Sequence, residues 1–402
     1  MIEFGLNNYR MRQLNKELIM SLLWREKVVT KSLLARLTDL TIPAVSNILQ
    51  ELLTEGAICH SEVKLSNRGI ASGSYILPEN NTMTLCLNVT PTAIESQLVD
   101  HQLSAVGDLS TSIINVPTPQ ALLDAIVQEH TKCQVMFKNK KIRLAIAIHG
   151  QVDPETGVSQ NMPQAPWKEH IEIKYLLEER LKCPVMIDND CIMLALAEKW
   201  QGQNEKKDFC VINVDYGIGS SFVINNVIYR GSLYGSGQIG HTIVNPDGRA
   251  CSCGRYGCLE TIASLNAIKK QLRIVIKTNP GIQFSRVDDM NTNHLIELWN
   301  QKVPIVHQLV EEGANAIGIS LYNLLNILNI NQIWFYGRSC KFGRKWLEMI
   351  TRHVLVNPFD PENNIKKNAT KIEFGQLTRQ QQIMGIAYLY VEENLVKFRT
   401  GL

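Results

Sequence analysis

The feature that most constrains the fold of this chain is a short cysteine-rich loop near its middle. In the segment GHTIVNPDGRACSCGRYGCLE, which begins at Gly240, three cysteines lie within eight residues and a histidine precedes them: His241, Cys251, Cys253 and Cys258. Three thiols and one imidazole are a ligand set suited to tetrahedral zinc. The set leaves no position for a substrate water, so we expect one structural Zn2+ per chain. The alternative is a metal-free loop of reduced cysteines.

The remaining cysteines do not predict a disulfide framework. They are scattered singly and mostly in apolar surroundings, so we expect them to be reduced and packed as small hydrophobic side chains: Cys59, Cys86, Cys133, Cys183, Cys191, Cys210 and Cys340. Apolar residues make up 45% and charged residues 20% of the chain, as is usual for globular proteins. The sequence has no apolar run of about 20 residues and no signal-peptide pattern. We therefore expect a cytoplasmic protein with no membrane insertion.

The first eighty residues predict three helices in quick succession. Leucines and isoleucines repeat at helical spacing between Leu14 and Leu23. Thr30 and Thr41 are placed to cap a short second helix and a third helix, and Gly56 ends the third. Helix, short helix, tight turn and helix is the helix-turn-helix layout, in which the last helix enters the DNA major groove. An apolar strand at 75–77, after a polar run, completes a plausible β-hairpin wing.

The outward positions of the third helix are the candidate DNA contacts: Ile42, Ala44, Ser46, Asn47 and Gln50. The amides of Asn47 and Gln50 can each bind adenine through two hydrogen bonds, and Arg68 at the wing tip could reach phosphate or the minor groove. Residues 1–77 hold nine Lys/Arg and seven Asp/Glu, so a shaped module, rather than bulk charge, would have to bind the DNA. The alternative is a three-helix bundle used for dimerisation or docking.

The segment from Gly237 to Glu260 resembles the signature of the ROK family, which groups repressors with sugar kinases. The family pattern is Glu-x-Gly-His, nine residues, then Cys-x-Cys-Gly-x-x-Gly-Cys-x-Glu, and the chain departs from it only at Gln238. The segments 185–198, 214–219 and 333–337 resemble the family's Asn-Asp segment, second phosphate loop and adenosine-facing turn. The N-terminal part is similar to that of the Mlc, NagC and xylose-repressor branch.

This resemblance implies an α/β fold of the actin-like (ribonuclease H-like) type, with two lobes and a sugar cleft. It divides the chain into a helix-turn-helix domain at 1–60, a wing and linker at 61–81, and an effector-binding domain with the zinc site at 82–402. It also implies which residues line the cleft and bind a sugar or sugar phosphate: Asn161, Asn189, Asp190, Gln238, His241 and Glu260. Some members of the branch respond to a transporter protein instead. His149, near this region, is interpreted as a buried, hydrogen-bonded histidine.

Kinase activity is not expected, although Asp190 matches the family's catalytic base. Kinases of this fold carry Asp-x-Gly-Gly-Thr after their first strand, where glycine amides approach phosphate oxygens. The corresponding stretch here, 85–92, has no glycine, Asn88 replaces the acid, and Pro91 has no N–H. Phosphoryl transfer depends on positioning and charge stabilisation, so we expect Asp190 to be vestigial as a base.

The sequence therefore predicts a DNA-binding transcriptional regulator, a repressor of carbohydrate uptake or metabolism genes. Because helix-turn-helix dimers read paired half-sites, we expect a homodimer or a dimer of dimers on a pseudo-palindromic operator. The alternatives are an ATP-dependent sugar kinase with an accessory N-terminal domain, and a regulator sequestered by a protein, with a vestigial cleft.

Overall fold

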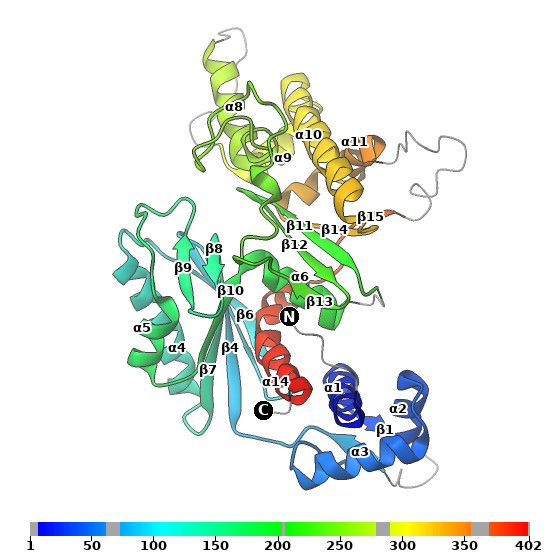
Figure 1. Ribbon diagram of the computed structural model, residues 1–402. Helices are drawn as coiled ribbons and strands as arrows, with labels where there is room; N and C mark the ends of the chain where they lie inside the picture. Colours follow the sequence, from blue (N-terminus) through cyan, green and yellow to red (C-terminus); the bar gives the residue numbers. More distant parts are fainter. Residues whose placement is uncertain (1–6, 62–72, 203–205, 279–289, 355–369, 401–402) are drawn as a thin grey trace, which may run out of the picture. The chain divides into compact units, whose positions relative to one another are not determined.

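The fold is organised around two five-stranded sheets, one in each of two units (Figure 1). A computed structural model describes residues 7–61, 73–202, 206–278, 290–354 and 370–400. Unit 1 comprises residues 1–201 together with 378–402, and unit 2 comprises residues 202–377. Each unit has its own apolar core. The sheets of both units are mixed, as the expected actin-like α/β fold requires.

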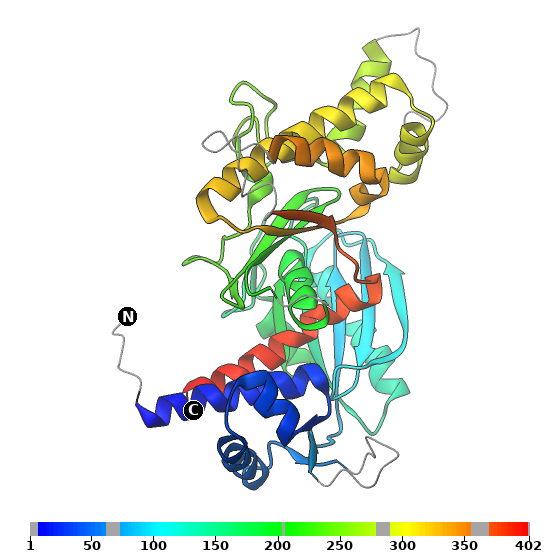
Figure 2. The ribbon, with the colours of Figure 1, turned by 90° about the vertical axis from the view of Figure 1, so that its right-hand side faces the viewer.

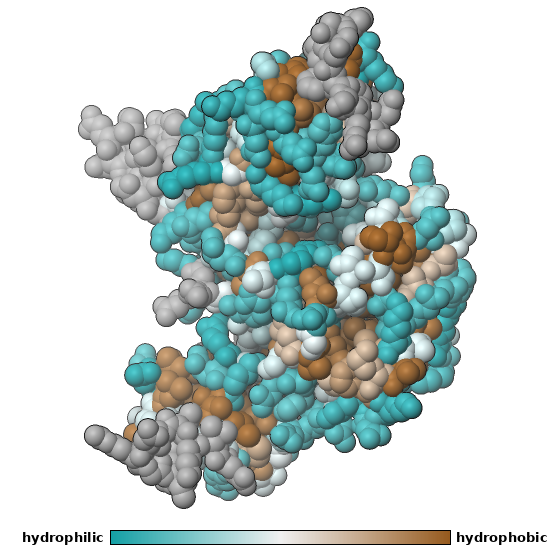
Figure 3. Space-filling model, turned by 180° about the vertical axis from the view of Figure 1, so that it is seen from behind, coloured by the Kyte–Doolittle hydropathy of each residue, from teal (hydrophilic) through white to brown (hydrophobic). Residues whose placement is uncertain are grey.

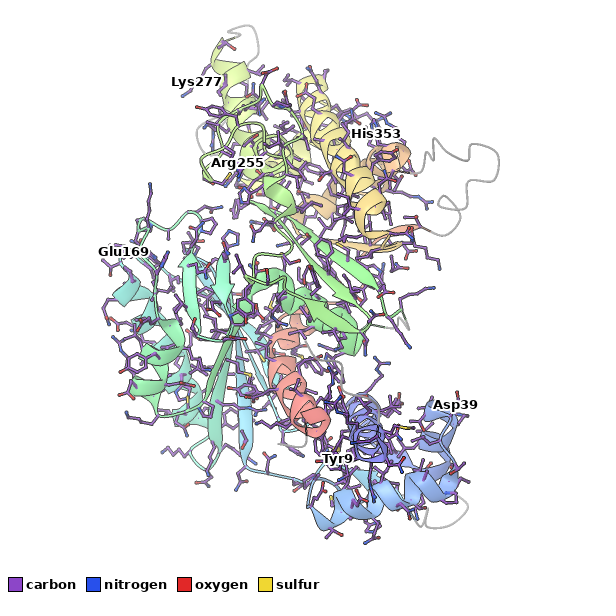
Figure 4. All side chains as sticks on the ribbon, in the orientation of Figure 1. Tyr9, Asp39, Glu169, Arg255, Lys277 and His353 are labelled. Carbon is purple, nitrogen blue, oxygen red and sulfur yellow. The ribbon has the colours of Figure 1, made fainter. Side chains whose placement is uncertain are left out.

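Unit 1 begins with three helices and a small sheet: α1 (Asn8–Glu26), β1 (Val29–Thr30), α2 (Lys31–Thr38), α3 (Ile42–Thr54), β2 (Cys59–His60) and β3 (Ser74–Ile76). The predicted caps are confirmed, because the side chain of Thr30 accepts from the amide of Leu33 and that of Thr41 from the amide of Ala44. Asp39, labelled in Figure 4, adopts a left-handed conformation in the turn between α2 and α3. Strand β3 pairs with both β2 and β1.

The apolar residues of these helices are less uniformly buried than their spacing predicts. On α3, Leu49 and Leu52 are fully buried, whereas Leu53 is half-buried. On α1, Leu14 and Leu18 are about two-fifths exposed. Hydrophobic residues are visible at the surface of this part of the chain in Figure 3. Helical spacing identifies the helices correctly, but neighbouring elements decide which apolar positions they cover.

The main sheet of unit 1 has the strand order β10-β7-β4-β5-β6. Helices α4 and α5 pack on one face, and α6 with the C-terminal helices on the other (Figure 1). The elements are β4 (Thr82–Val89), β5 (Ala93–Val99), β6 (Ala105–Ile113), α4 (Pro119–Met136), β7 (Lys141–Ile148), β8 (Gln151–Asp153), β9 (Val158–Asn161), α5 (Ile173–Leu181), β10 (Val185–Asn189), α6 (Asp190–Gln201), α13 (Arg379–Met384), η3 (Gly385–Ala387) and α14 (Tyr388–Thr400). The last of these, α14, runs beside α1 (Figure 2).

Unit 2 is built on a sheet of order β13-β12-β11-β14-β15. Its elements are β11 (Phe209–Val214), β12 (Ile218–Ile224), β13 (Val227–Tyr229), η1 (Ile239–His241), α7 (Glu260–Ala263), α8 (Leu265–Thr278), α9 (Thr292–Asn300), α10 (Pro304–Leu328), β14 (Gln332–Tyr336), η2 (Arg338–Phe342), α11 (Arg344–Val354) and β15 (Lys371–Phe374). The long apolar helix α10 buries a broad face in the core. Among the described residues, no helix is both long and apolar enough to cross a membrane.

Candidate functional site

The four predicted metal ligands come together in unit 2. One ligand atom from each of His241, Cys251, Cys253 and Cys258 lies within 4.8 Å of the others. Sγ of Cys251 is 3.5 Å from Nδ1 of His241, and Sγ of Cys253 is 3.6 Å from Sγ of Cys258. Zinc–sulfur bonds of about 2.3 Å in a tetrahedron separate two sulfurs by roughly 3.8 Å. The cluster therefore has the size and the donor chemistry that a tetrahedral zinc ion requires.

Backbone geometry holds the cysteine loop, which Arg255 marks in Figure 4. Gly257 has φ +70°, and a Cβ there would lie 1.5 Å from the carbonyl oxygen of Asn245, so only glycine fits this turn. Without a metal the thiols perturb one another: burial, followed by the neighbouring thiols of Cys253 and Cys251, raises the pKa of Cys258 to about 12. A divalent cation would favour the thiolate form instead.

The predicted sugar contacts of unit 1 lie at the carboxyl ends of β9 and β10. Asn189 ends β10, and its side chain donates to the carbonyl of Gly150 and accepts from the amide of Cys191 (2.7 Å). Asp190 begins α6 and is partly exposed. Asn161 ends β9, and its side chain is exposed. Its backbone lies against Gly150, where an added Cβ would be 1.9 Å from the carbonyl oxygen of Asn161. Asn161 and Asn189 thus both lie against Gly150, and Asp190 follows Asn189 in the chain.

His149 is hydrogen-bonded, as predicted, but it is half-buried rather than buried. Its Nδ1 lies 3.2 Å from Oδ2 of Asp190, and its side chain is 24% exposed. The residue follows directly after the buried strand β7. His149 therefore contacts the one carboxylate that matches the family's base, a partnership that the sequence analysis missed because the two residues are 41 positions apart.

The predicted sugar contacts of unit 2 surround the short helices η1 and α7. Gln238 precedes η1 and is exposed, and His241 at its end belongs to the metal cluster. Glu260 begins α7, and its Oε2 accepts a hydrogen bond from the amide of Ile218 (2.9 Å). This bond ties the carboxylate to the loop between β11 and β12, so Glu260 has a structural partner as well as a half-exposed surface.

The position of the first phosphate loop, between β4 and β5, is occupied by internal contacts. Asn88 is 5% exposed, and its Nδ2 donates to Oε2 of Glu95 (2.8 Å). Glu95 is paired in turn with Arg379. In the turn, the amide of Thr90 donates to the carbonyl of Ala93 (2.9 Å), and the amide of Ala93 donates to the hydroxyl of Thr90 (3.0 Å). An acidic side chain and engaged amides do not form an anion-binding cradle.

The second phosphate loop, between β11 and β12, is also held by an ion pair. Nε and Nη2 of Arg338 donate to Oδ1 of Asp215 at 2.9 and 2.6 Å, and the Arg338 guanidinium lies 4.0 Å from the ring centroid of Tyr216. Burial lowers the pKa of Arg338, but the hydrogen bonds that it donates to the Asp215 carboxylate outweigh this effect, and the pKa is raised. Arg338 follows Gly337, the last residue of the segment that resembles the family's adenosine-facing turn. Its ion-pair partner, Asp215, could not be identified from the sequence.

The predicted DNA contacts lie on the outer face of α3. Ile42, Asn47 and Gln50 are exposed, whereas Ala44 and Ser46 are half-buried. The buried residues on the opposite face of α3 fix this orientation. Arg68 lies outside the described residues.

Comparisons with known proteins agree with this geometry. The ROK family model matches residues 84–393. An uncharacterized protein of Escherichia coli (strain K12), YphH, is 56% identical over 97% of this chain and 98% of its own length. The xylose repressor of Caldicellulosiruptor bescii is 23% identical over 97% of this chain and 98% of its own length. Among solved structures, a ROK family transcriptional regulator homologous to E. coli Mlc matches with a TM-score of 0.77 and 18% identity, covering 98% of this chain and 100% of that chain.

Sugar kinases also match, over a smaller part of the chain. A glucokinase of Halalkalibacterium halodurans is 28% identical over 54% of this chain and 67% of the kinase. Repressors and kinases are thus both among the relatives of this chain. The family model that includes both covers residues 84–393. The chain therefore belongs to the ROK family.

Proposed function

We propose that the protein is a DNA-binding transcriptional regulator, a repressor of carbohydrate uptake or metabolism genes that a sugar or sugar phosphate controls. The observation that carries this proposal is the N-terminal arrangement: two capped helices, α2 and α3, joined by a tight turn, beside the small β1-β3-β2 sheet. These elements have the layout of a winged helix-turn-helix. Residues 1–60 would form the helix-turn-helix, 61–81 the wing and linker, and 82–402 the effector-binding domain.

In this proposal α3 is the recognition helix. Asn47 and Gln50 project from its exposed face and would read bases, while Ile42, Ala44 and Ser46 lie near its N-terminal end. Two such helices, from a homodimer or a dimer of dimers, would bind the half-sites of a pseudo-palindromic operator.

Both phosphate-loop positions support a regulator rather than a kinase. Glu95 places a carboxylate beside the first loop, and Arg338 is engaged by Asp215 at the second. An ATP-dependent sugar kinase would have to break the second ion pair and would still lack the amide cradle at the first loop. Sugar-dependent consumption of ATP by the purified protein would favour this second candidate function.

Contacts within unit 1 could transmit an effector signal to the DNA-binding helices. Helix α6 begins at Asp190, and at its other end Lys199 lies 2.5 Å from Glu392 of α14. Farther along α14, Arg399 donates to both carboxylate oxygens of Glu17 on α1. Helices α6 and α14, together with these two ion pairs, therefore connect the proposed effector contact Asp190 with α1, the first helix of the N-terminal domain. An effector that displaces α6 would bias the position of α1, as allosteric coupling requires.

The cysteine cluster is proposed to hold one structural zinc ion. His241, Cys251, Cys253 and Cys258 would supply all four ligands. Zinc bound in this way contributes folding free energy to the loop that it closes. Because the loop connects Gln238 and Glu260, the ion would also fix the spacing of these two proposed effector contacts.

Footprinting of the purified full chain on its own upstream DNA tests the proposal, with and without a panel of sugars and sugar phosphates. We expect a protected pseudo-palindrome that one of these compounds releases. Absence of protection at low salt, where electrostatic contacts are strongest, would contradict DNA binding. Protection that no compound releases would instead favour control by a transporter protein.

A further inference from the structure

The junction between the N-terminal helices and the rest of unit 1 contains a cavity of about 500 Å³. Its walls come from α1, the end of α3, the segment after β3, the β5–β6 turn and α14. Binding sites for small molecules occupy about 300–1,000 Å³, so the cavity is large enough for one. It involves none of the predicted sugar contacts.

The charged side chains of the cavity wall have opposite charges beside them. Lys16 is 6% exposed, and its Nζ lies 3.0 Å from Glu51 and 2.6 Å from Glu55. Lys397 lies 3.7 Å from Glu393. An ionic ligand would have to compete with these pairs or be buried without a counter-charge, which is costly. The wall therefore favours a neutral ligand.

The remaining wall combines apolar rings with neutral polar groups. Trp24 and Phe398 provide aromatic surface, while Gln13, Asn80 and Asn394 provide side-chain amides. Amides both donate and accept hydrogen bonds, so they match ligands whose groups do the same.

His101 adds an observation that points to a missing partner. It lines the cavity, and its buried Nε2 has no hydrogen-bond partner among the described residues. Buried polar atoms in folded proteins are rarely left in this state. Because this atom is out of solvent contact, a ligand in the cavity would satisfy it only after the imidazole turned toward the cavity.

We propose that this cavity binds a neutral carbohydrate of mono- or disaccharide size. A sugar ring has a face of C–H groups that suits Trp24 and Phe398 and an edge of hydroxyls that suits the amides. A purely aromatic ligand would leave the amides without partners, and a sugar phosphate would have to compete with glutamates for the lysines of the wall. Occupancy does not depend on the proposed function, but its consequence does: the bound sugar would bridge α1 and α14 and so change the affinity of the protein for DNA.

The test uses the full chain and neutral probes, namely the methyl glycosides of glucose, galactose, mannose and xylose, with maltose and cellobiose. Binding is measured by calorimetry and by tryptophan fluorescence. The variants are Ala57→Phe, which fills the cavity, and Asn394→Leu, which removes an amide at similar volume. Asn293→Ala, which removes an exposed amide from α9 in unit 2, is the matched control, and Asp190→Asn reports probe binding at the separate proposed effector contact.

We expect at least one neutral probe to bind. Each cavity variant should raise the Kd of that probe by about tenfold or more, because Ala57→Phe occupies the volume of the ligand and Asn394→Leu removes one to two hydrogen bonds. Asn293→Ala should leave that Kd unchanged, and hexose phosphates should bind more weakly than neutral sugars. Melting temperatures and DNA footprints of the variants show whether they fold. The proposal is overturned if no neutral probe binds, if folded Ala57→Phe binds normally, or if Asp190→Asn alone abolishes binding. Failure of the DNA footprint with intact probe binding would refute the proposed function and not the cavity.

Discussion

Replacing Asn47 by alanine separates base reading from general affinity for DNA. The side chain is exposed, and its neighbours Ile48 and Leu49 are 5% and 1% exposed and anchor α3. Alanine has a higher helix propensity than asparagine by about 0.5 kcal/mol, so Asn47→Ala should not unfold the helix. A two-point amide–adenine contact contributes about 1–3 kcal/mol. Operator affinity should therefore fall about 5- to 150-fold for each half-site, and a symmetric dimer would lose twice that free energy.

The assay is a titration of the footprinted operator and of a scrambled duplex of equal length at one salt concentration. Asn293→Ala, which removes an exposed amide from α9 in unit 2, is the matched control. We expect Asn47→Ala to weaken operator binding while binding to the scrambled duplex stays constant. An equal loss on both duplexes would show that Asn47 contacts phosphate, and no loss on either would remove α3 from the recognition surface.

Three further predictions concern the metal, the core and the phosphate loops. Cys253→Ser should lose the zinc that elemental analysis detects and lower the melting temperature, whereas Cys133→Ser, outside the cluster, should keep it; normal zinc content in Cys253→Ser would show that the site is wrongly assigned. Leu49→Ala, at a fully buried position, should cost about 2–5 kcal/mol in urea denaturation, and a loss well below 1 kcal/mol would contradict the packing of α3. Neither the wild type nor Arg338→Gly should consume ATP with any sugar, because the first loop lacks its cradle in both; turnover in a coupled assay would reverse this conclusion.

Local sequence signals determined much of this structure. Thr30 and Thr41 define helix starts because their hydroxyls accept otherwise unpaired amides close by in the chain. The metal cluster was predictable for a similar reason: His241 and the three cysteines lie within eighteen residues, and glycines such as Gly257 allow the loop to close.

Long-range pairing was not predictable from spacing or composition. Arg338 lies 123 residues from Asp215, and Arg379 lies 284 residues from Glu95. A charged residue in a sequence gives no indication of which distant charge it will meet, since that depends on how strands and helices are brought together. The sequence showed that the first phosphate loop lacks its glycines; only the tertiary structure showed the Glu95–Arg379 ion pair beside that loop and the Asp215–Arg338 ion pair at the second loop.

The same division applies to exposure and to the junction cavity. Sequence periodicity located α1 and α3, but Leu14 and Leu18 proved partly exposed because burial depends on which elements pack against a helix. The cavity combines α1 with α14, which lie at opposite ends of the chain. The sequence by itself determined the family, the helix caps and the cluster of one histidine and three cysteines, because these depend on residues close together in the chain. Tertiary structure decided the ion pairs, the exposed faces and the cavity, because each arises from contacts between segments that folding alone brings together.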